Sequence, residues 1–144
     1  MSRALLVLAV VACGCSNSGP KAEEFVPSED AARRALATSL DAWKDRGPTA
    51  KSDAANPAVE TADGLRTKDR TLLKYDILGP VPGEAARVFA VRLTLANPPQ
   101  ELKERYVVLG LDPLWVWRYD DFLMLTHWDH RMADPKGQPP AAKR

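Results

Sequence analysis

The sequence predicts an α+β domain in which one N-terminal helix packs on a curved antiparallel meander of about four strands. Two observations carry this prediction. Apolar residues recur at helical spacing between residues 28 and 47, whereas after Thr71 they alternate with polar residues at a period of two. Short segments containing glycine or proline separate the alternating runs, which favours antiparallel pairing of strands that are neighbours in the chain.

The helix is expected to begin at Ser28 and to end at Gly47-Pro48. A serine hydroxyl accepts hydrogen bonds from the free N–H groups of a first helical turn, and glycine followed by proline is typical of a C-terminus. Apolar residues spaced three or four apart form one stripe: Ala32, Leu36, Leu40 and Trp43. We expect this stripe to pack on the sheet.

Alternation of apolar and polar residues places the strands. The expected strands cover residues 58–62, 71–77, 87–95, 102–111 and 114–119, of which the last four form the meander. Within the first strand of the meander, Leu73, Tyr75 and Ile77 are expected to share one face.

The two following strands should supply most of the sheet's core. One face of residues 87–95 is apolar: Phe89, Val91, Leu93 and Leu95. Residues 106–109 are almost wholly apolar, which predicts a central strand buried on both faces or nearly so. Beyond them, Asp120-Asp121 can cap a short helix that carries Phe122, Leu125 and Trp128.

The N-terminus has the pattern of an export signal. A single positive charge, Arg3, precedes an unbroken apolar run from Ala4 to Ala12. The run is far shorter than the ~20 residues that a membrane-spanning helix needs. It matches the apolar core of a secretory signal, about 7–15 residues long. We therefore expect residues 1–12 to be a signal peptide.

The segment Val10-Val11-Ala12-Cys13 resembles the lipobox of bacterial lipoproteins. The resemblance implies that Cys13 becomes the first mature residue and carries the acyl chains that bind membrane lipid. Two or more chains anchor a protein stably, whereas one does so marginally. Cys15 fits less well because a poorer match, Ala12-Cys13-Gly14, precedes it. The implied location is a bacterial membrane, on its periplasmic face or at the cell surface; an ordinary cleaved export signal is the alternative.

Composition divides the rest of the chain into tether, domain and tail. Residues 13–27 are small and polar with two prolines, as expected of a flexible tether. Residues 28–132 form the predicted domain. Residues 133–144 are charged and rich in proline, and we expect them to be disordered.

The order of the predicted elements resembles the cystatin-like α+β roll. The larger cone-shaped fold of the nuclear-transport-factor-2-like superfamily is the close alternative. Both resemblances rest on topology alone, and a fold does not carry a function with it. The Gln-x-Val-x-Gly hairpin of inhibitory cystatins is missing from residues 97–101, so protease inhibition is not predicted.

Charge and cysteine content exclude several function classes. Removing Arg3 with the signal lowers the 20 basic residues to 19, which balance the 19 acidic ones. With no basic surplus to follow a phosphate backbone, nucleic acid is not an expected partner. Cys13 and Cys15 are the only cysteines, so the predicted domain has neither a disulfide nor a cysteine-ligated zinc.

No catalytic residue, cofactor or metal is predicted. The sequence lacks a Gly-x-Ser-x-Gly elbow, and the adjacent carboxylates Asp120 and Asp121 point apart and fit a helix cap better. The two histidines, His127 and His130, are the only metal candidates. Their spacing puts both rings on one side of a helix, but no HExxH or comparable motif supports zinc, and a solvated helix edge is the preferred explanation.

Three alternating aromatic residues form the candidate interaction surface. Trp115, Trp117 and Tyr119 should lie on one face of the last predicted strand. Exposed, they would stack on sugar rings or receive a partner protein. Alternatively, this face packs on the helix around Leu40 and Trp43, or the segment after Asp121 folds back over it.

These observations predict an exported lipoprotein whose non-catalytic domain acts as an interaction or envelope-structural module. Its partners would be membrane lipid, through Cys13, and a protein or glycan of the cell envelope. The alternative is a small-ligand binder or enzyme that uses a cavity between helix and sheet. A filled core favours the first and would include Leu36, Leu40, Trp43, Phe89, Val91 and Trp117. A pocket with a buried acid, lined by Tyr75, Tyr106 or Arg118, favours the second.

Overall fold

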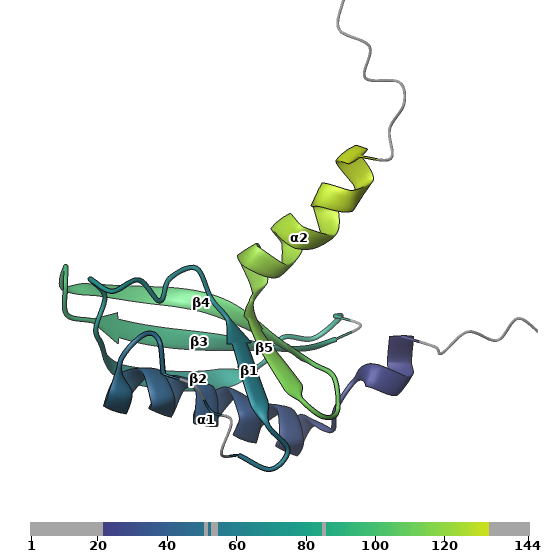
Figure 1. The fold of residues 1–144 in the computed structure, drawn as a ribbon, viewed down its shortest axis with the longest axis horizontal. Coiled ribbons are helices and arrows are strands. Elements are labelled where there is room, and N and C mark those ends of the chain that lie inside the picture. The colour runs from purple at the N-terminus through teal and green to yellow at the C-terminus, as the bar shows by residue number, and fades with distance from the viewer. Residues whose placement is uncertain (1–21, 51, 53–54, 85, 133–144) are drawn as a thin grey trace, which may run out of the picture.

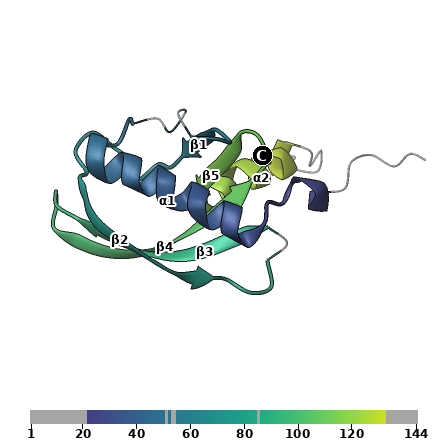
Figure 2. The same ribbon diagram turned by 90° about the horizontal axis from the view of Figure 1, so that it is seen from below.

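The structure, a computed structural model, describes residues 22–50, 52, 55–84 and 86–132, with only the backbone at 22, 23 and 128–132. In chain order the elements are η1 (Ala22–Phe25), α1 (Glu29–Arg46), β1 (Val59–Ala62), β2 (Leu72–Pro80), β3 (Arg87–Leu95), β4 (Gln100–Leu109), β5 (Leu114–Arg118) and α2 (Tyr119–Met132). Helix α1 lies along the concave face of a curved sheet, while α2 projects from the molecule (Figures 1 and 2). The α+β class is confirmed.

Helix α1 has the ends that the sequence predicts. Ser28 Oγ accepts a hydrogen bond from the Ala31 N–H at 3.2 Å, which caps the first turn. At the other end the Gly47 N–H donates to the Trp43 carbonyl at 2.9 Å, with Gly47 at a φ of 96° that favours glycine. The predicted apolar stripe is buried throughout: Ala32, Leu36, Leu40 and Trp43.

The sheet has five strands and is mixed, which corrects the expected antiparallel meander of about four. Its order is β1-β5-β4-β3-β2. Strands β2 to β5 form the predicted meander, but β1 adds a fifth strand that runs parallel to β5, with Val59 opposite Leu114. Alternation within a segment predicts a strand, but it does not identify a neighbour that lies far away in the sequence.

The core lies between α1 and the sheet. The predicted inner face of β3 is fully buried: Phe89, Val91, Leu93 and Leu95. Strand β4 is the middle strand, and Tyr106, Val107 and Val108 are all buried, which confirms the prediction of a central strand.

Strand β2 departs from its predicted alternation. Tyr75 and Ile77 pack against the core as expected, but Leu73 is exposed and Leu72 is buried in its place. The β2–β3 register shifts between Leu72 and Lys74. Such an irregularity inserts an extra residue and reverses the side on which the following residues point, and this exchanges the two leucines.

One strand boundary also differs from that expected. Strand β5 ends at Arg118, and Tyr119 is the first residue of α2. At the N-terminal side, the carbonyl of Phe25 accepts from the Gly110 N–H at 2.8 Å, and that of Pro27 accepts from Arg87 Nε at 2.9 Å. The end of the segment predicted as a tether is therefore attached to the domain.

No helix in the described part of the chain is long and apolar enough to span a membrane. Cys13, the signal segment and residues 133–144 lie outside the described residues.

Candidate functional site

The predicted aromatic surface is divided between a strand and a helix. Trp115 and Trp117 lie on the outer face of β5 and stack, with ring centroids 5.9 Å apart and planes inclined by 29°. Trp115 is exposed and Trp117 is half-buried. Tyr119 belongs to α2, where its hydroxyl donates to Glu84 at 3.1 Å.

The tryptophans do not pack on α1. Leu114 and Val116, which alternate with them along β5, belong to the core beneath α1. The expectation that the aromatic face meets Leu40 and Trp43 is therefore wrong, and so is the expected place of Trp117 in that core. A strand with one solvated face ordinarily alternates apolar and polar residues, but both faces of β5 carry large apolar side chains. Alternation alone therefore did not show which face is buried.

Helix α2 carries further exposed apolar side chains. It leaves the sheet at the end of β5 and extends away from the domain (Figure 1). Phe122 and Leu123, near its start, are half-buried, whereas Met124 and Leu125 are exposed. Large exposed apolar side chains on neighbouring elements are a feature of interaction sites. The outer face of β5 together with α2 is the candidate interaction surface.

The histidines give no metal site among the described residues. Both belong to α2; His127 is exposed, and the side chain of His130 lies outside the described part. Within that part no three histidine, cysteine, aspartate or glutamate side chains are grouped to hold a metal ion.

A buried ion pair, missed by the sequence analysis, lies under the C-terminal half of α1. The carboxylate of Asp63 and the guanidinium of Arg66 are 3.3 Å apart, and their side chains are 0% and 5% exposed. Arg66 also donates to the Ser39 carbonyl at 3.1 Å and to Ser39 Oγ at 2.7 Å, while its guanidinium lies 5.1 Å from the centre of the Trp43 ring. Ser39 interrupts the apolar stripe of α1, which was the one sequence signal of this network.

Both oxygens of Asp63 are occupied. Oδ1 accepts from the Leu65 N–H at 2.9 Å, and Oδ2 accepts from the Tyr106 hydroxyl at 2.7 Å in addition to Arg66 Nε. Burial, and then the charge and hydrogen bond of Asp63, raise the pKa of Tyr106 well above its ordinary value. Tyr106 therefore stays a hydroxyl donor, and the carboxylate of Asp63, which is 0% exposed, is held within this network.

A second ion cluster adjoins the first through Gly64. The Gly64 N–H donates to Asp121 Oδ2 at 2.7 Å, and Arg118 donates to the two Asp121 oxygens at 2.9 and 2.8 Å. These bonds with Arg118 lower the pKa of Asp121. Glu104 lies 3.9 Å from Arg118, yet burial raises the pKa of Glu104. The cluster fixes the start of α2 to the Asp63-Gly64 turn.

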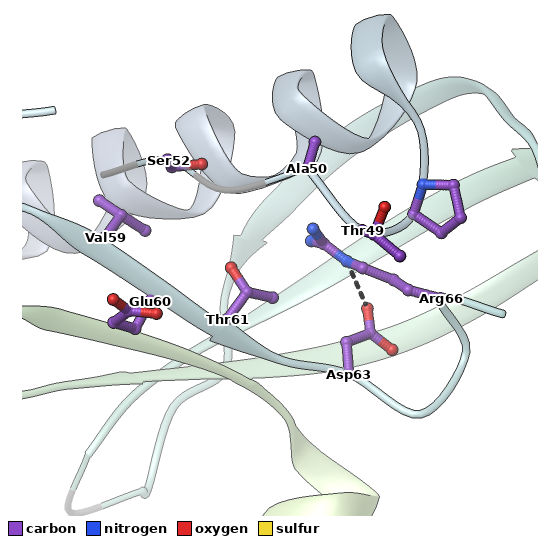
Figure 3. A pocket seen from close by; sticks show the side chains of 9 residues that line it. Thr49, Ala50, Ser52, Val59, Glu60, Thr61, Asp63 and Arg66 are labelled. Atoms are coloured by element: carbon purple, nitrogen blue, oxygen red, sulfur yellow. Dashed lines mark hydrogen bonds and ion pairs between the residues drawn. The ribbon is translucent and has the colours of Figure 1, made fainter. Parts of the chain in front are cut away.

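A polar cavity of about 240 Å³ opens beside Arg66 (Figure 3). Its lining consists of residues 48–50, Ser52, residues 59–61, Asp63 and Arg66. Ligand pockets usually measure about 300–1,000 Å³ and are mainly apolar. This one is smaller and lined largely by hydroxyl and charged groups, and it suits water better than an organic ligand.

No known protein family, curated protein or solved structure matches this chain.

Proposed function

We propose that the chain is an exported bacterial lipoprotein, attached to the membrane through acylated Cys13, whose domain is a non-catalytic interaction or envelope-structural module. The resemblance of residues 10–13 to a lipobox supports export and attachment to the membrane. The partner surface is the outer face of β5 around Trp117, continued by Tyr119 and α2.

The interior supports a non-catalytic role. The space between α1 and the sheet is filled by buried side chains: Leu36, Leu40, Trp43, Phe89 and Val91. The carboxylate of the buried acid, Asp63, accepts hydrogen bonds from Leu65, Tyr106 and Arg66. The polar cavity does not include Tyr75, Tyr106 or Arg118 among the described residues that line it. These features favour interaction over the alternative of a ligand-binding or catalytic cavity.

The observation that carries the proposal is the exposure of Leu125 and Met124 on a helix that extends away from the domain (Figure 1). A large apolar side chain gains free energy when it leaves water, and residues of this kind dominate the binding energy of interfaces. An envelope protein with an accessible hydrophobic groove, or a glycan that stacks on Trp117, would remove these side chains from water.

The proposal is tested by photocrosslinking in intact cells. A benzophenone amino acid replaces Leu125 in one strain and Leu73, on β2, in a matched control, because both side chains are 56% exposed. One discrete protein or muropeptide adduct is expected from position 125 and none from position 73. Equal adduct patterns at both positions would contradict a specific partner surface.

The proposed attachment to the membrane is tested by two cysteine variants in the same host. Cys13→Ala should abolish acylation and release the protein from washed membranes, whereas Cys15→Ala should leave both unchanged, because Cys13 follows the better match to a lipobox. Mass spectrometry of the N-terminal peptide measures the lipid directly. Full acylation and membrane retention of Cys13→Ala would refute lipidation at Cys13.

A further inference from the structure

A separate group of exposed apolar side chains lies where the N-terminal segment joins the domain. Phe25, at the end of η1, and Leu111, in the turn between β4 and β5, are both about half exposed. The backbone joins the two positions at Gly110, the residue before Leu111, whose N–H donates to the Phe25 carbonyl at 2.8 Å. Trp115 borders the group, because a Cβ placed on Gly110 would lie 3.8 Å from Trp115 Cδ1.

The position of the proposed lipid anchor limits how far this group can lie from a membrane. Cys13 precedes Ala22, the first residue of η1, by nine positions. Nine residues span at most about 32 Å even when fully extended. The bound applies to Ala22, and the chain then enters the domain through η1, which ends at Phe25.

We propose that Phe25 and Leu111 insert into the surface of the lipid bilayer and form a second, non-covalent contact with it. The inference rests on the proposed lipid anchor. Aromatic side chains favour the membrane–water interface, and apolar side chains that penetrate about 5–10 Å into it leave water as they would in a protein core. An anchor that already holds the domain at the surface removes most of the entropy cost of this weak contact.

The contact depends on apolar burial and not on charge. In the chain each of the two residues has an acidic neighbour, Glu24 before Phe25 and Asp112 after Leu111. They repel anionic headgroups, so electrically neutral lipid should suffice and added salt should not release the contact.

The contact also fixes which part of the domain faces away from the membrane. Strand β5 leads from the turn that holds Leu111 toward α2, with a rise of about 3.3 Å for each residue. Trp115 lies near the bilayer, whereas Tyr119 and Leu125 lie progressively farther along the chain and on an element that projects from the domain (Figure 1). The bilayer thus occupies one end of β5 and leaves the α2 end for a partner.

The test uses the full lipidated chain in phosphatidylcholine vesicles. In a Cys15→Ser parent the sulfur of Cys13 is acylated, so an added cysteine is the only free thiol. A polarity-sensitive nitrobenzoxadiazole dye is attached at Leu111→Cys and, as a matched control, at Leu73→Cys; the native leucines are 55% and 56% exposed. The dye at 111 should shift to the blue and lose about half of its emission when the acyl chains carry bromine, and the dye at 73 should change little.

Three results would overturn the inference, and they differ from one another. Equal emission and equal quenching at 111 and 73 would show no preferred contact. A blue shift at 111 that bromine does not quench, and that grows with protein density, would show a second copy of the chain instead of lipid. Dye on the parent itself would reveal a free Cys13, which refutes the lipid anchor of the proposed function and removes the basis for the bilayer contact.

Discussion

Two aspartate–arginine pairs of equal sequence separation meet at the Asp63-Gly64 turn, in very different surroundings. Asp63 and Arg66 are 0% and 5% exposed, whereas Asp121 and Arg118 are 18% and 17% exposed. The more accessible pair has the shorter contact, 2.8 Å against 3.3 Å. Distance alone would rank Asp121 and Arg118 first, but the free-energy cost of leaving one partner unpaired grows with burial.

The two pairs also differ in the elements that they connect. Around the buried pair, Ser39, Thr61 and Tyr106 supply hydrogen bonds from α1, β1 and β4, so one network joins three elements. The more accessible pair joins the start of α2 to Gly64 through Asp121, and Arg118 lies 3.9 Å from Glu104 on β4. The fold thus places its buried charges where elements meet and leaves the projecting helix attached at one end.

The largest effect is expected from Asp63→Asn. The amide keeps the shape of the carboxylate but leaves the buried Arg66 cation without its counter-charge, at a cost of about 3–5 kcal/mol in the free energy of unfolding. Urea unfolding followed by tryptophan fluorescence measures it, since Trp43 lies against Arg66.

A second variant checks the cause of that loss. In Asp63→Asn/Arg66→Met no charge remains stranded, so the double variant should be more stable than Asp63→Asn alone. If the two unfold at the same urea concentration, the loss reflects hydrogen bonds of the turn and not an uncompensated cation.

The sequence predicted the features of the fold that depend on local signals and missed those that depend on contacts between distant segments. Ser28 and Gly47-Pro48 act within one helical turn, so the ends of α1 were predictable, and the face of β3 follows from alternation alone. The pairing of β1 with β5 and the irregularity after Leu72 depend on tertiary register, which no local pattern contains.

The candidate surface was predicted in part for the same reason. Alternation placed Trp115 and Trp117 together on one face, but it did not decide which face meets α1, because Leu114 and Val116 are apolar as well. The buried pair went unnoticed since Asp63-Gly64 reads as a turn, and a turn residue is ordinarily solvated. Lipidation of Cys13 remains a prediction.

An intermediate effect is expected from Asp121→Asn. A loss of about 1–2 kcal/mol lies between the values of exposed and buried pairs. Because the pKa of Asp121 is lowered in the folded protein, its carboxylate contributes stability that is fully present above the ordinary pKa of aspartate, about 3.9. That contribution disappears as the pH falls through the lower folded pKa.

The pH and salt dependence distinguish the two pairs. The stability difference between the parent and Asp121→Asn should shrink below about pH 4, and also in 1 M salt, where the screening length is about 3 Å. The difference caused by Asp63→Asn should respond less to salt, because its pair is enclosed. An equal response of both differences to salt would argue that burial does not separate these pairs.

The smallest effect is expected from Lys74→Ala, which removes an ion pair with Asp76 at 3.6 Å. Both side chains are largely exposed on β2, so the gain from their attraction is offset by solvation and by side-chain entropy. Urea unfolding should register a change below about 0.5 kcal/mol. Across the three variants, the expected loss of stability follows the burial of the ion pair and not the distance between the charged atoms. A loss at Lys74 as large as that at Asp121 would break the series, and it would mean that strand-edge packing of the lysine stem, rather than charge, had been measured.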